Sequence, residues 1–326
     1  MQKNETYSVE ITGLTAEGEG VARVDGQVVF VPGVIPGERC KIKIDHVGRT
    51  CAYGSLVRVE KTSEHRVTPE CESFGHCGGC VFWHMDYACE LEQKRRRVQD
   101  ALSRIGGIDF PDLQITGSES IYGYRNKVQF PVQVQNGKAV AGFYKAGSHT
   151  VIPITDCKIQ PGVAKTIRAA VLSWMEKENV PAYDERTHTG LVRHIYLRYG
   201  AKSGQTLVCT VANCEALPKK KALVREILAA DANVTGIVVN YNTKKSNVIL
   251  GERFETLYGE GYLEDMLLGL TFRLSPAAFY QVNHDQAERL YEKAIEFARF
   301  TGEETALDLY CGSGTITLCL ARHVKT

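Results

Sequence analysis

The stretch Leu307-Asp308-Leu309-Tyr310-Cys311-Gly312-Ser313-Gly314-Thr315 decides the fold class of the C-terminal part of the chain. Residues 305–310 have the pattern of a strand, and residues 316–321 have that of the apolar start of a helix. A strand, a glycine-rich turn and a helix in this order form the first unit of a doubly wound, Rossmann-like α/β sheet. In such a unit the backbone of the turn comes close to a ligand.

The residues of this turn narrow the choice of ligand. The turn lacks the Gly-Lys-Ser/Thr ending of a phosphate-binding loop and the third glycine of a dinucleotide fingerprint. The pattern D-x-x-C-G-x-G, which begins at Asp308, fits an S-adenosylmethionine site better. A tight turn without a ligand is the alternative interpretation.

The composition is that of a globular protein. The 326 residues are enough for two or three domains of about 100–200 residues each. The chain has 44% hydrophobic and 24% charged residues, as ordinary globular proteins do. This composition excludes three descriptions of the whole chain: a disordered protein, a collagen-like repeat and a small disulfide scaffold. The net charge of +1 means that binding of an acidic partner would need a local basic surface. No signal-peptide pattern and no apolar run of about 18 residues is present, so we expect a cytoplasmic protein with no membrane association and reduced cysteines.

Residues 1–62 predict an OB-like β-barrel. Runs rich in valine, isoleucine and aromatic residues alternate with glycine turns at 7–12, 20–24, 28–31, 40–46 and 54–59. Asp25-Gly26 between two of these runs is a strong hairpin signal. Barrels of this class include oligonucleotide-binding domains, although a small barrel of another role has the same pattern.

Residues 63–275 predict an α+β domain with a largely antiparallel sheet, because strand and helix patterns are mixed. We expect strands at 127–135, 139–144, 192–199, 206–212 and 234–240. We expect helices at 86–105, 164–178 and 219–230, and a further one at 285–300 whose apolar face includes Leu290 and Phe297. Helix 86–105 carries Lys94-Arg95-Arg96-Arg97, which either contacts phosphates or forms a solvated face.

Cys71-x5-Cys77-Gly-Gly-Cys80 is the strongest local chemical signal. Thiolates at this spacing can face one ion or cluster, and soft sulfur ligands select zinc or iron–sulfur clusters. A fourth ligand is available from Cys89, which would complete a zinc-like knuckle, or from the distant Cys157, as in some iron–sulfur proteins. The spacing leaves both open.

Together these features resemble one family, the S-adenosylmethionine-dependent RNA (uracil-5-)-methyltransferases, in particular their 23S rRNA branch. The segment from Gly18 to Glu38 is similar to the TRAM domain, an RNA-binding barrel. Gly123-Tyr124-Arg125-Asn126-Lys127 and Arg193-His194 are similar to central motifs of the family. Ser275-Pro276-Ala-Ala-Phe279-Tyr-Gln281-Val282-Asn283 is similar to the signature that precedes its catalytic domain.

The resemblance implies a multidomain chain and a set of site residues. The expected domains are a TRAM barrel at 1–62, a central α+β domain at 63–275 with a cluster-binding segment at 71–80, and the start of a methyltransferase domain at 276–326. The implied ligands of a [4Fe-4S] cluster are Cys71, Cys77, Cys80 and Cys157, which favours Cys157 over Cys89. The implied S-adenosylmethionine contacts are Gln281, Tyr310, Asp308, Gly312, Gly314 and Thr315, with Asp308 shaping the junction between strand and turn. Phe279 is implied to stack on the target base, and Tyr124 and Arg125 are hypotheses for further RNA contact.

The implied reaction is methylation of C5 of a uridine in 23S rRNA by a monomeric enzyme. A cysteine thiolate adds to C6, C5 takes the methyl group, and a base removes the C5 proton before the enzyme is eliminated. The target base must leave its stack to reach the site. The family's nucleophilic Cys, in a Ser-Cys-Asn-Pro segment, and its basic Glu are expected beyond Thr326. Cys311 belongs to the cofactor turn and is not assigned the nucleophilic role.

Because one strand–helix unit cannot cover both faces of a parallel sheet, we expect a fragment that binds RNA and a cluster but does not turn over. Three other interpretations remain open. The first is a tRNA (uracil-5-)-methyltransferase. The second is a radical methylthiotransferase, although that class uses a C-x3-C-x2-C motif and carries its TRAM domain at the other end. The third is a non-catalytic RNA-binding protein with a structural metal.

Overall fold

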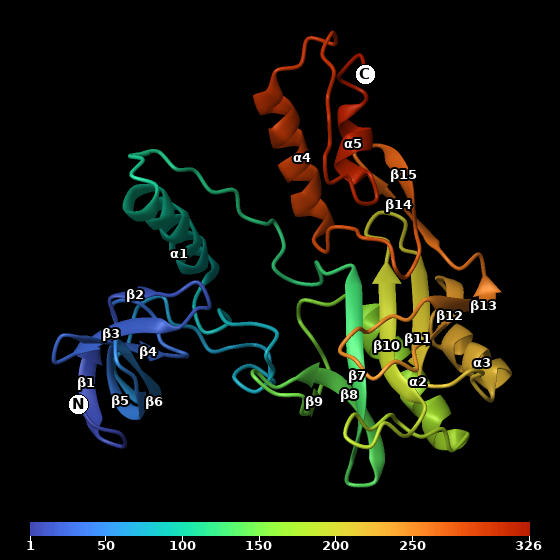
Figure 1. Ribbon diagram of the computed structural model, residues 1–326, viewed down its shortest axis with the longest axis horizontal. Helices are drawn as coiled ribbons and strands as arrows, with labels where there is room; N and C mark the ends of the chain where they lie inside the picture. Colours follow the sequence, from blue (N-terminus) through green and yellow to red (C-terminus); the bar gives the residue numbers. More distant parts are fainter. The chain divides into compact units, whose positions relative to one another are not determined.

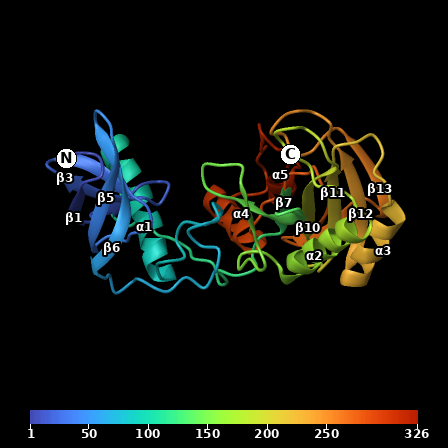
Figure 2. The same ribbon diagram turned by 90° about the horizontal axis from the view of Figure 1, so that it is seen from below.

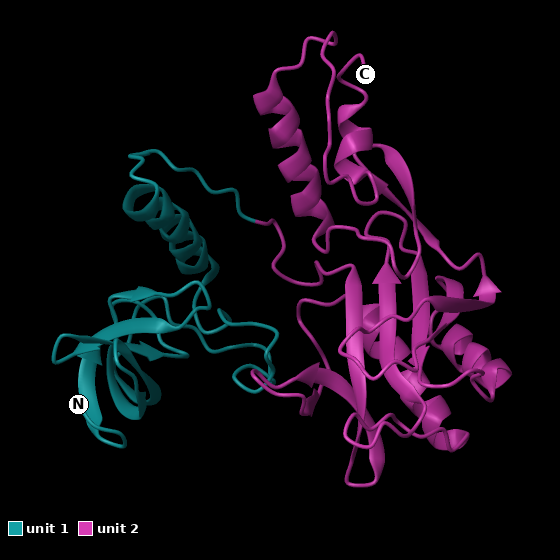
Figure 3. Ribbon diagram, viewed as in Figure 1, with its two compact units in different colours: residues 1–117 teal, residues 118–326 magenta.

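The computed structural model describes residues 1–326 and divides them into two compact units, residues 1–117 and residues 118–326 (Figure 3). Each unit has its own hydrophobic core. No helix in either unit is both long enough and apolar enough to cross a membrane. The expected domain boundaries after residues 62 and 275 remain predictions.

Unit 1 contains a six-stranded sheet. Its strands are β1 (Thr6–Glu10), β2 (Gly13–Leu14), β3 (Gly20–Val24), β4 (Gln27–Val31), β5 (Arg39–Val47) and β6 (Cys51–Lys61). They lie in the order β1-β5-β6-β4-β3-β2, and only the β4–β6 pair is parallel. Asp25 and Gly26 have φ values of 49° and 81°, as a two-residue hairpin turn of type I′ requires. The five expected strands are confirmed, whereas β2 is too short to leave a sequence pattern.

Unit 1 also contains the expected helix 86–105. Helix α1 (Tyr87–Asp100) begins at Asp86, whose carboxylate accepts the Cys89 N–H at 2.7 Å, and continues as a wider π-helical turn, η1 (Ala101–Ile105). Gly106 caps the end of η1, and Gly107 follows it with a φ of 64°. The basic run is already paired in part, because Glu92 accepts bonds from both Arg95 and Arg96. This favours the solvated-face interpretation for those two arginines.

Unit 2 is built on a seven-stranded sheet of the order β13-β12-β11-β10-β7-β8-β9 (Figure 1). Only the β11–β12 pair is parallel, so the largely antiparallel sheet is confirmed. Helices α2 (Gly162–Lys177) and α3 (Lys220–Ala230) pack on one face of this sheet (Figure 2). The strands are β7 (Lys127–Gln135), β8 (Lys138–Tyr144), β9 (Val151–Pro153), β10 (Val192–Tyr199), β11 (Thr206–Ala212), β12 (Val234–Tyr241) and β13 (Arg253–Gly259).

The second face of the central strands is also covered. Tyr196, Cys209 and Val238 share a core with a hairpin, β14 (Leu263–Leu267) and β15 (Leu270–Leu274), and with helix α4 (His284–Ala298). The expected apolar face of α4 is only partly buried: Leu290 and Phe297 are 60% and 74% exposed. Ala287 and Tyr291 make the contacts with the core instead.

The strand predicted at residues 305–310 is wrong. A strand forms only where another strand pairs with it, and this segment instead bonds to the end of the chain. Ala306 N–H donates to the carbonyl of Thr326 at 2.8 Å, and Lys325 N–H donates to that of Glu304 at 2.9 Å. Helix α5 (Thr315–Leu320) does follow the glycine turn. The turn and helix of the expected doubly wound unit are therefore present without its strand.

Candidate functional site

The segment that carries Phe279 is held down by two side chains of β10. Tyr196 donates its hydroxyl to the Pro276 carbonyl at 2.6 Å, and Arg198, which is only 2% exposed, donates to the carbonyls of Pro276 and Ala278. The Phe279 ring, by contrast, is 61% exposed. The backbone of this segment is thus fixed while one aromatic ring is presented to solvent.

A second anchor comes from the Gly123–Lys127 motif. Asn126 N–H donates to the Val282 carbonyl at 2.9 Å, and Asn126 Nδ2–H donates to the Gln281 carbonyl at 2.7 Å. Arg125 also forms a β-bridge with Asn283. The two motifs, which are more than 150 residues apart in sequence, lie side by side.

The glycine turn meets the same segment. Ser313 Oγ donates to the carbonyl of Phe279. Gly312 and Gly314 have φ values of 55° and 73°, and a Cβ added to Gly312 would meet no atom within 4 Å. The backbone of the turn is therefore open to an approaching ligand. Among the predicted site residues, the structure joins the turn to Phe279. The bond from Asn126 places the Gln281 carbonyl beside the motif that contains Arg125.

The remaining predicted cofactor residues differ in their surroundings. Tyr310 is 95% exposed. The Asp308 carboxylate accepts the Tyr310 N–H at 3.1 Å and the Thr317 hydroxyl at 2.6 Å, so it stabilises the turn. The Thr315 hydroxyl lies 2.9 Å from that of Tyr291 and is buried. Asp308 and Thr315 are thus engaged within the protein.

Three of the four predicted metal ligands lie in one loop of unit 1. Cys77 N–H donates to the Ser73 carbonyl at 2.8 Å, and Gly79 N–H donates to Cys77 Sγ at 3.3 Å. Burial raises the pKa of the Cys77 thiol, and the neighbouring Cys71 raises it further. A Cβ added at Gly79 would lie 3.4 Å from Cys77 Sγ, which is an ordinary van der Waals distance. Cys157 lies in unit 2, in the turn that follows β9.

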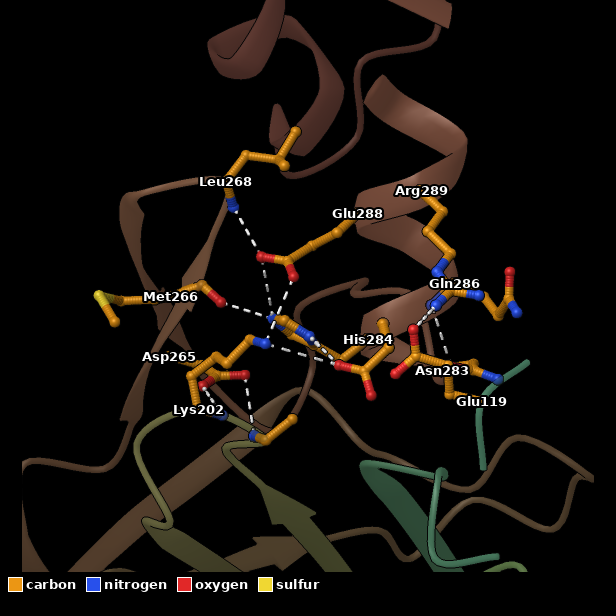
Figure 4. Close-up of polar contacts among 12 residues, drawn as sticks. Glu119, Lys202, Asp265, Met266, Leu268, Asn283, His284, Gln286, Glu288 and Arg289 are labelled. Carbon is orange, nitrogen blue, oxygen red and sulfur yellow. Dashed lines mark hydrogen bonds and ion pairs between the residues drawn. The ribbon is translucent and has the colours of Figure 1, made fainter. Parts of the chain in front are cut away.

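A buried carboxylate supports the Phe279 segment from the hairpin. Asp265 is 1% exposed and accepts the backbone N–H groups of Ala201, Lys202 and Ser203 at 3.0, 2.9 and 3.1 Å (Figure 4). The Tyr280 hydroxyl lies 3.5 Å from the same carboxylate. Burial and the charge of Asp265 raise the pKa of Tyr280, which is therefore a neutral donor.

His284, Asp285 and Glu288 place possible ligand atoms within 4.8 Å of one another (Figure 4). A cation is already present there, because Lys202 Nζ lies 3.7 Å from Asp285 Oδ1 and 3.4 Å from Glu288 Oε2. His284 Nε2 lies 2.5 Å from the Met266 carbonyl, so this nitrogen carries a proton and is a donor. The group is an ion-paired network that ties α4 to the hairpin.

Comparison with known proteins identifies the chain. The TRAM domain model matches residues 1–57. An uncharacterized RNA methyltransferase of Clostridium tetani is 39% identical over 325 residues, which are 100% of this chain and 71% of that protein. The chain belongs to the RNA methyltransferase family. A relative from Halalkalibacterium halodurans is 40% identical to this RNA methyltransferase over 326 residues, with the same shares of both chains.

The fold of this RNA methyltransferase has a solved counterpart. The Pyrococcus abyssi tRNA (uracil-54, C5)-methyltransferase, solved in complex with S-adenosyl-L-homocysteine, superimposes with a TM-score of 0.75. The match covers 97% of this chain and 71% of that one, at 24% sequence identity. The likeness confirms the fold, and with it the multidomain architecture.

The sequence motifs gave no role to Arg198 or Asp265. A signal was present in both cases, because residues two positions away on the same side of the strand are apolar or aromatic: Tyr196 for Arg198, and Leu263 and Leu267 for Asp265. A charge at an inward strand position predicts a buried polar anchor. Which carbonyls and N–H groups it binds depends on loops far away in the sequence.

Proposed function

We propose that this RNA methyltransferase transfers a methyl group from S-adenosylmethionine to C5 of a uridine in 23S rRNA. The observation that carries the proposal is the bond from Ser313 Oγ to the Phe279 carbonyl, which joins the glycine turn to the exposed aromatic ring. Methyl transfer needs the methyl donor and the accepting base next to each other. Phe279 is the surface on which an unstacked base would be held.

The backbone of the glycine turn is suited to binding S-adenosylmethionine. Gly312 leaves the chain open to a close approach, and the exposed Tyr310 ring offers an aromatic face beside it. Gln281 is two residues after Phe279 on the same segment, and Asn126 holds its backbone carbonyl, which supports its assignment to the cofactor site. We assign Asp308 and Thr315 to the shape of the turn, with Thr315 limited to backbone contact because its hydroxyl is engaged. When bound, S-adenosylmethionine supplies an electrophilic methyl group on a sulfonium.

The loop that contains Cys71, Cys77 and Cys80 offers the sulfur ligands that an iron–sulfur cluster requires. Cys71, Cys77 and Cys80 are partly exposed, uncrosslinked thiols, and soft sulfur ligands are those that such clusters require. The N–H of Gly79 on Cys77 Sγ is the kind of contact that stabilises a ligating thiolate. We propose a [4Fe-4S] cluster on these residues with Cys157 as the fourth ligand, and methyl transfer itself requires no redox step from it.

The first test compares RNA partners. Binding of RNA by the 326-residue chain is the quantity measured. We expect anaerobically purified chain to bind 23S rRNA fragments more tightly than tRNA transcripts in competition assays. The fold likeness to a tRNA (uracil-54, C5)-methyltransferase makes tRNA the second candidate, and a preference for tRNA would select it.

The second test separates a methyltransferase from an RNA-binding module. We expect calorimetry to show that the chain binds S-adenosyl-L-homocysteine. Gly314→Val should weaken this binding by about tenfold or more. Gly314 has a positive φ, and a β-branched residue cannot adopt that left-handed conformation without distorting the turn. Gly302→Val is the matched control, since Gly302 also has a positive φ, of 94°, but lies outside the turn. RNA binding without any cofactor binding would favour a non-catalytic role.

A further inference from the structure

Three aromatic rings form a row across the sheet of unit 1. Tyr53 of β6 pairs directly with Phe30 of β4 on one side and with His46 of β5 on the other. The ring centroids of Tyr53 and Phe30 lie 5.6 Å apart, and those of Tyr53 and His46 lie 6.4 Å apart. Such contacts stabilise a sheet, but Tyr53 is still 44% exposed, so an aromatic surface remains open to solvent.

A ladder of cations continues from this row along β5. Alternate residues of this strand, from Cys40 to Ile44, are buried in the core. Because successive side chains of a strand point to opposite faces, Arg39, Lys41 and Lys43 lie on the outer face of the sheet. Tyr53 lies on the same face, since both of its neighbours in β6 are buried. The outer face therefore carries rings at one end and positive charges over a further length of about 13 Å.

Most of these cations are not neutralised by the protein. Arg39 stands directly opposite Lys61 in the sheet, and Lys41 stands directly opposite Arg58. Among these four side chains, only Arg58 is in an ion pair, with Glu60 at 3.0 Å. Like charges that stand opposite one another destabilise a sheet. An anion bound along the ladder would remove this repulsion.

A cavity of about 420 Å³ opens at the Arg39 end of the ladder. Arg39 and Lys61 are both in its wall, together with the hydroxyl-bearing Ser8. Glu10 is the one carboxylate of the wall, and it lies opposite Arg39 on β1 without forming an ion pair. The lining is therefore positive on balance, as the binding of an anionic group such as a phosphate requires.

We infer that the outer face of β4, β6 and β5 binds a single-stranded segment of the RNA. The inference rests on the proposed RNA substrate and concerns nucleotides other than the methylated uridine. Surfaces that hold single strands combine aromatic rings, on which bases stack, with cations that follow the phosphates. This face offers both, in adjacent positions of the same strands. A duplex fits it less well, because paired bases are stacked within the helix and do not reach the rings.

The test measures binding of single-stranded octacytidylate to the 326-residue chain by fluorescence anisotropy. The length of this probe is within the range of about 4–16 nucleotides that one barrel of this class covers. We expect Tyr53→Ala to weaken its binding at least about fivefold, the effect of losing one stacking partner. Tyr258→Ala is the matched control, because Tyr258 is 43% exposed against 44% for Tyr53 and lies on β13 of unit 2.

A second variant tests the ladder and leaves the rings in place. Lys41→Ala combined with Lys43→Ala removes two charges from the outer face, where neither side chain belongs to the core. Each phosphate contact of a single strand contributes about 0.7 to the slope of log K against log salt concentration, so the slope should fall by about 1.4. Lys165→Ala combined with Lys221→Ala is the control, since it removes two exposed lysines from α2 and α3.

Four results would overturn the inference. They are absence of octacytidylate binding, equal losses in Tyr53→Ala and Tyr258→Ala, an unchanged salt slope in the variant of Lys41 and Lys43, or a duplex of the same length that binds as tightly as the single strand. Amide exchange of unit 1 shows whether Tyr53→Ala folds, and if it does not, the lysine variant decides. Failure here is distinguishable from failure of the proposed function, because octacytidylate contains no uridine and S-adenosyl-L-homocysteine binding is measured separately.

Discussion

Asn126 donates its side-chain N–H to the Gln281 carbonyl at 2.7 Å, across 155 positions of sequence. The bond fixes the segment that carries Phe279 against the end of β7, and the bonds from Arg198 fix the other side of that segment. The Phe279 ring is therefore exposed on a backbone that is hydrogen-bonded before and after it.

This arrangement predicts a selective loss in Phe279→Ala. Base–aromatic stacking contributes about 1–3 kcal/mol per base, so we expect uridine-containing single-stranded RNA to bind at least about fivefold more weakly. The free energy of unfolding should change by less than about 0.5 kcal/mol, because the ring is largely exposed. Fluorescence anisotropy measures the binding. Phe297→Ala is the control, since Phe297 is 74% exposed on α4, and an equal loss in both variants would contradict the assignment.

The cluster assignment predicts different outcomes for individual cysteines. Cys77→Ser and Cys157→Ser should lose nearly all iron and acid-labile sulfide and the broad visible absorbance, because a serine hydroxyl is a poor ligand for a soft site. Cys89→Ser should keep them, since the buried Cys89 lies in α1 and is not an implied ligand. Metal analysis of anaerobic protein provides the measurement. A colourless protein with one zinc that is lost in Cys89→Ser would establish the zinc knuckle instead.

The buried Glu38 predicts acid sensitivity of unit 1. Burial by itself would raise the pKa of Glu38, but the Arg66 guanidinium and the Ile35 N–H together hold it below its usual value. A lowered folded-state pKa means that the stabilisation is complete well above the unfolded pKa of about 4.3 and is lost as the pH falls through the folded value.

Glu38→Gln should therefore destabilise unit 1 by about 2 kcal/mol at pH 7, because a charged hydrogen bond is lost. The difference from the wild type should start to shrink below pH of about 4, because there the unfolded chain takes up a proton on this carboxyl while the folded protein, with its lowered pKa, does not yet do so. Hydrogen exchange of the amides of β5 at several pH values measures this. A difference that stays constant down to pH of about 3 would contradict a lowered pKa.

The buried Asp265 predicts a large effect on unit 2. Asp265→Ala leaves three backbone N–H groups without their acceptor, so we expect a loss of about 2–4 kcal/mol in the free energy of unfolding. Glu264→Ala, one residue away, removes only an exposed ion pair with Arg273 and should cost less than about 1 kcal/mol. Urea unfolding followed by Trp174 fluorescence in a Trp83→Phe background compares them. Equal effects would show that the carboxylate is not an anchor.

The sequence predicts most of the regular elements, because their patterns are local. The strands β7, β10 and β11 have the predicted bounds, and Ile167, Val171 and Trp174 are buried on α2 as the helical spacing indicates. The hairpin β14–β15 has no turn signal strong enough to predict it. The strand at 305–310 has the right pattern but lacks a pairing partner, which a local pattern cannot reveal.

The arrangement of the candidate site could not be predicted from the sequence, and the roles of its residues stay predictions. The family signature identifies Phe279, Gln281 and the glycine turn, whereas the bonds that join them run from Asn126, Arg198 and Ser313. The acceptors of these bonds are backbone carbonyls. Every residue has a backbone carbonyl, so the amino-acid sequence does not indicate which one accepts the bond.

The fixed backbone around Phe279 has a consequence for the rate of RNA capture. No loop of the protein has to become ordered when a base meets this ring, so little conformational entropy is lost on the protein side. If Phe279 receives the target base as proposed, the slow step of binding is the opening of the RNA, which limits how long that base spends outside its helix. RNA regions whose bases are already unpaired should be captured fastest, so the folding state of the RNA, and not motion of the protein, would decide when this site is filled.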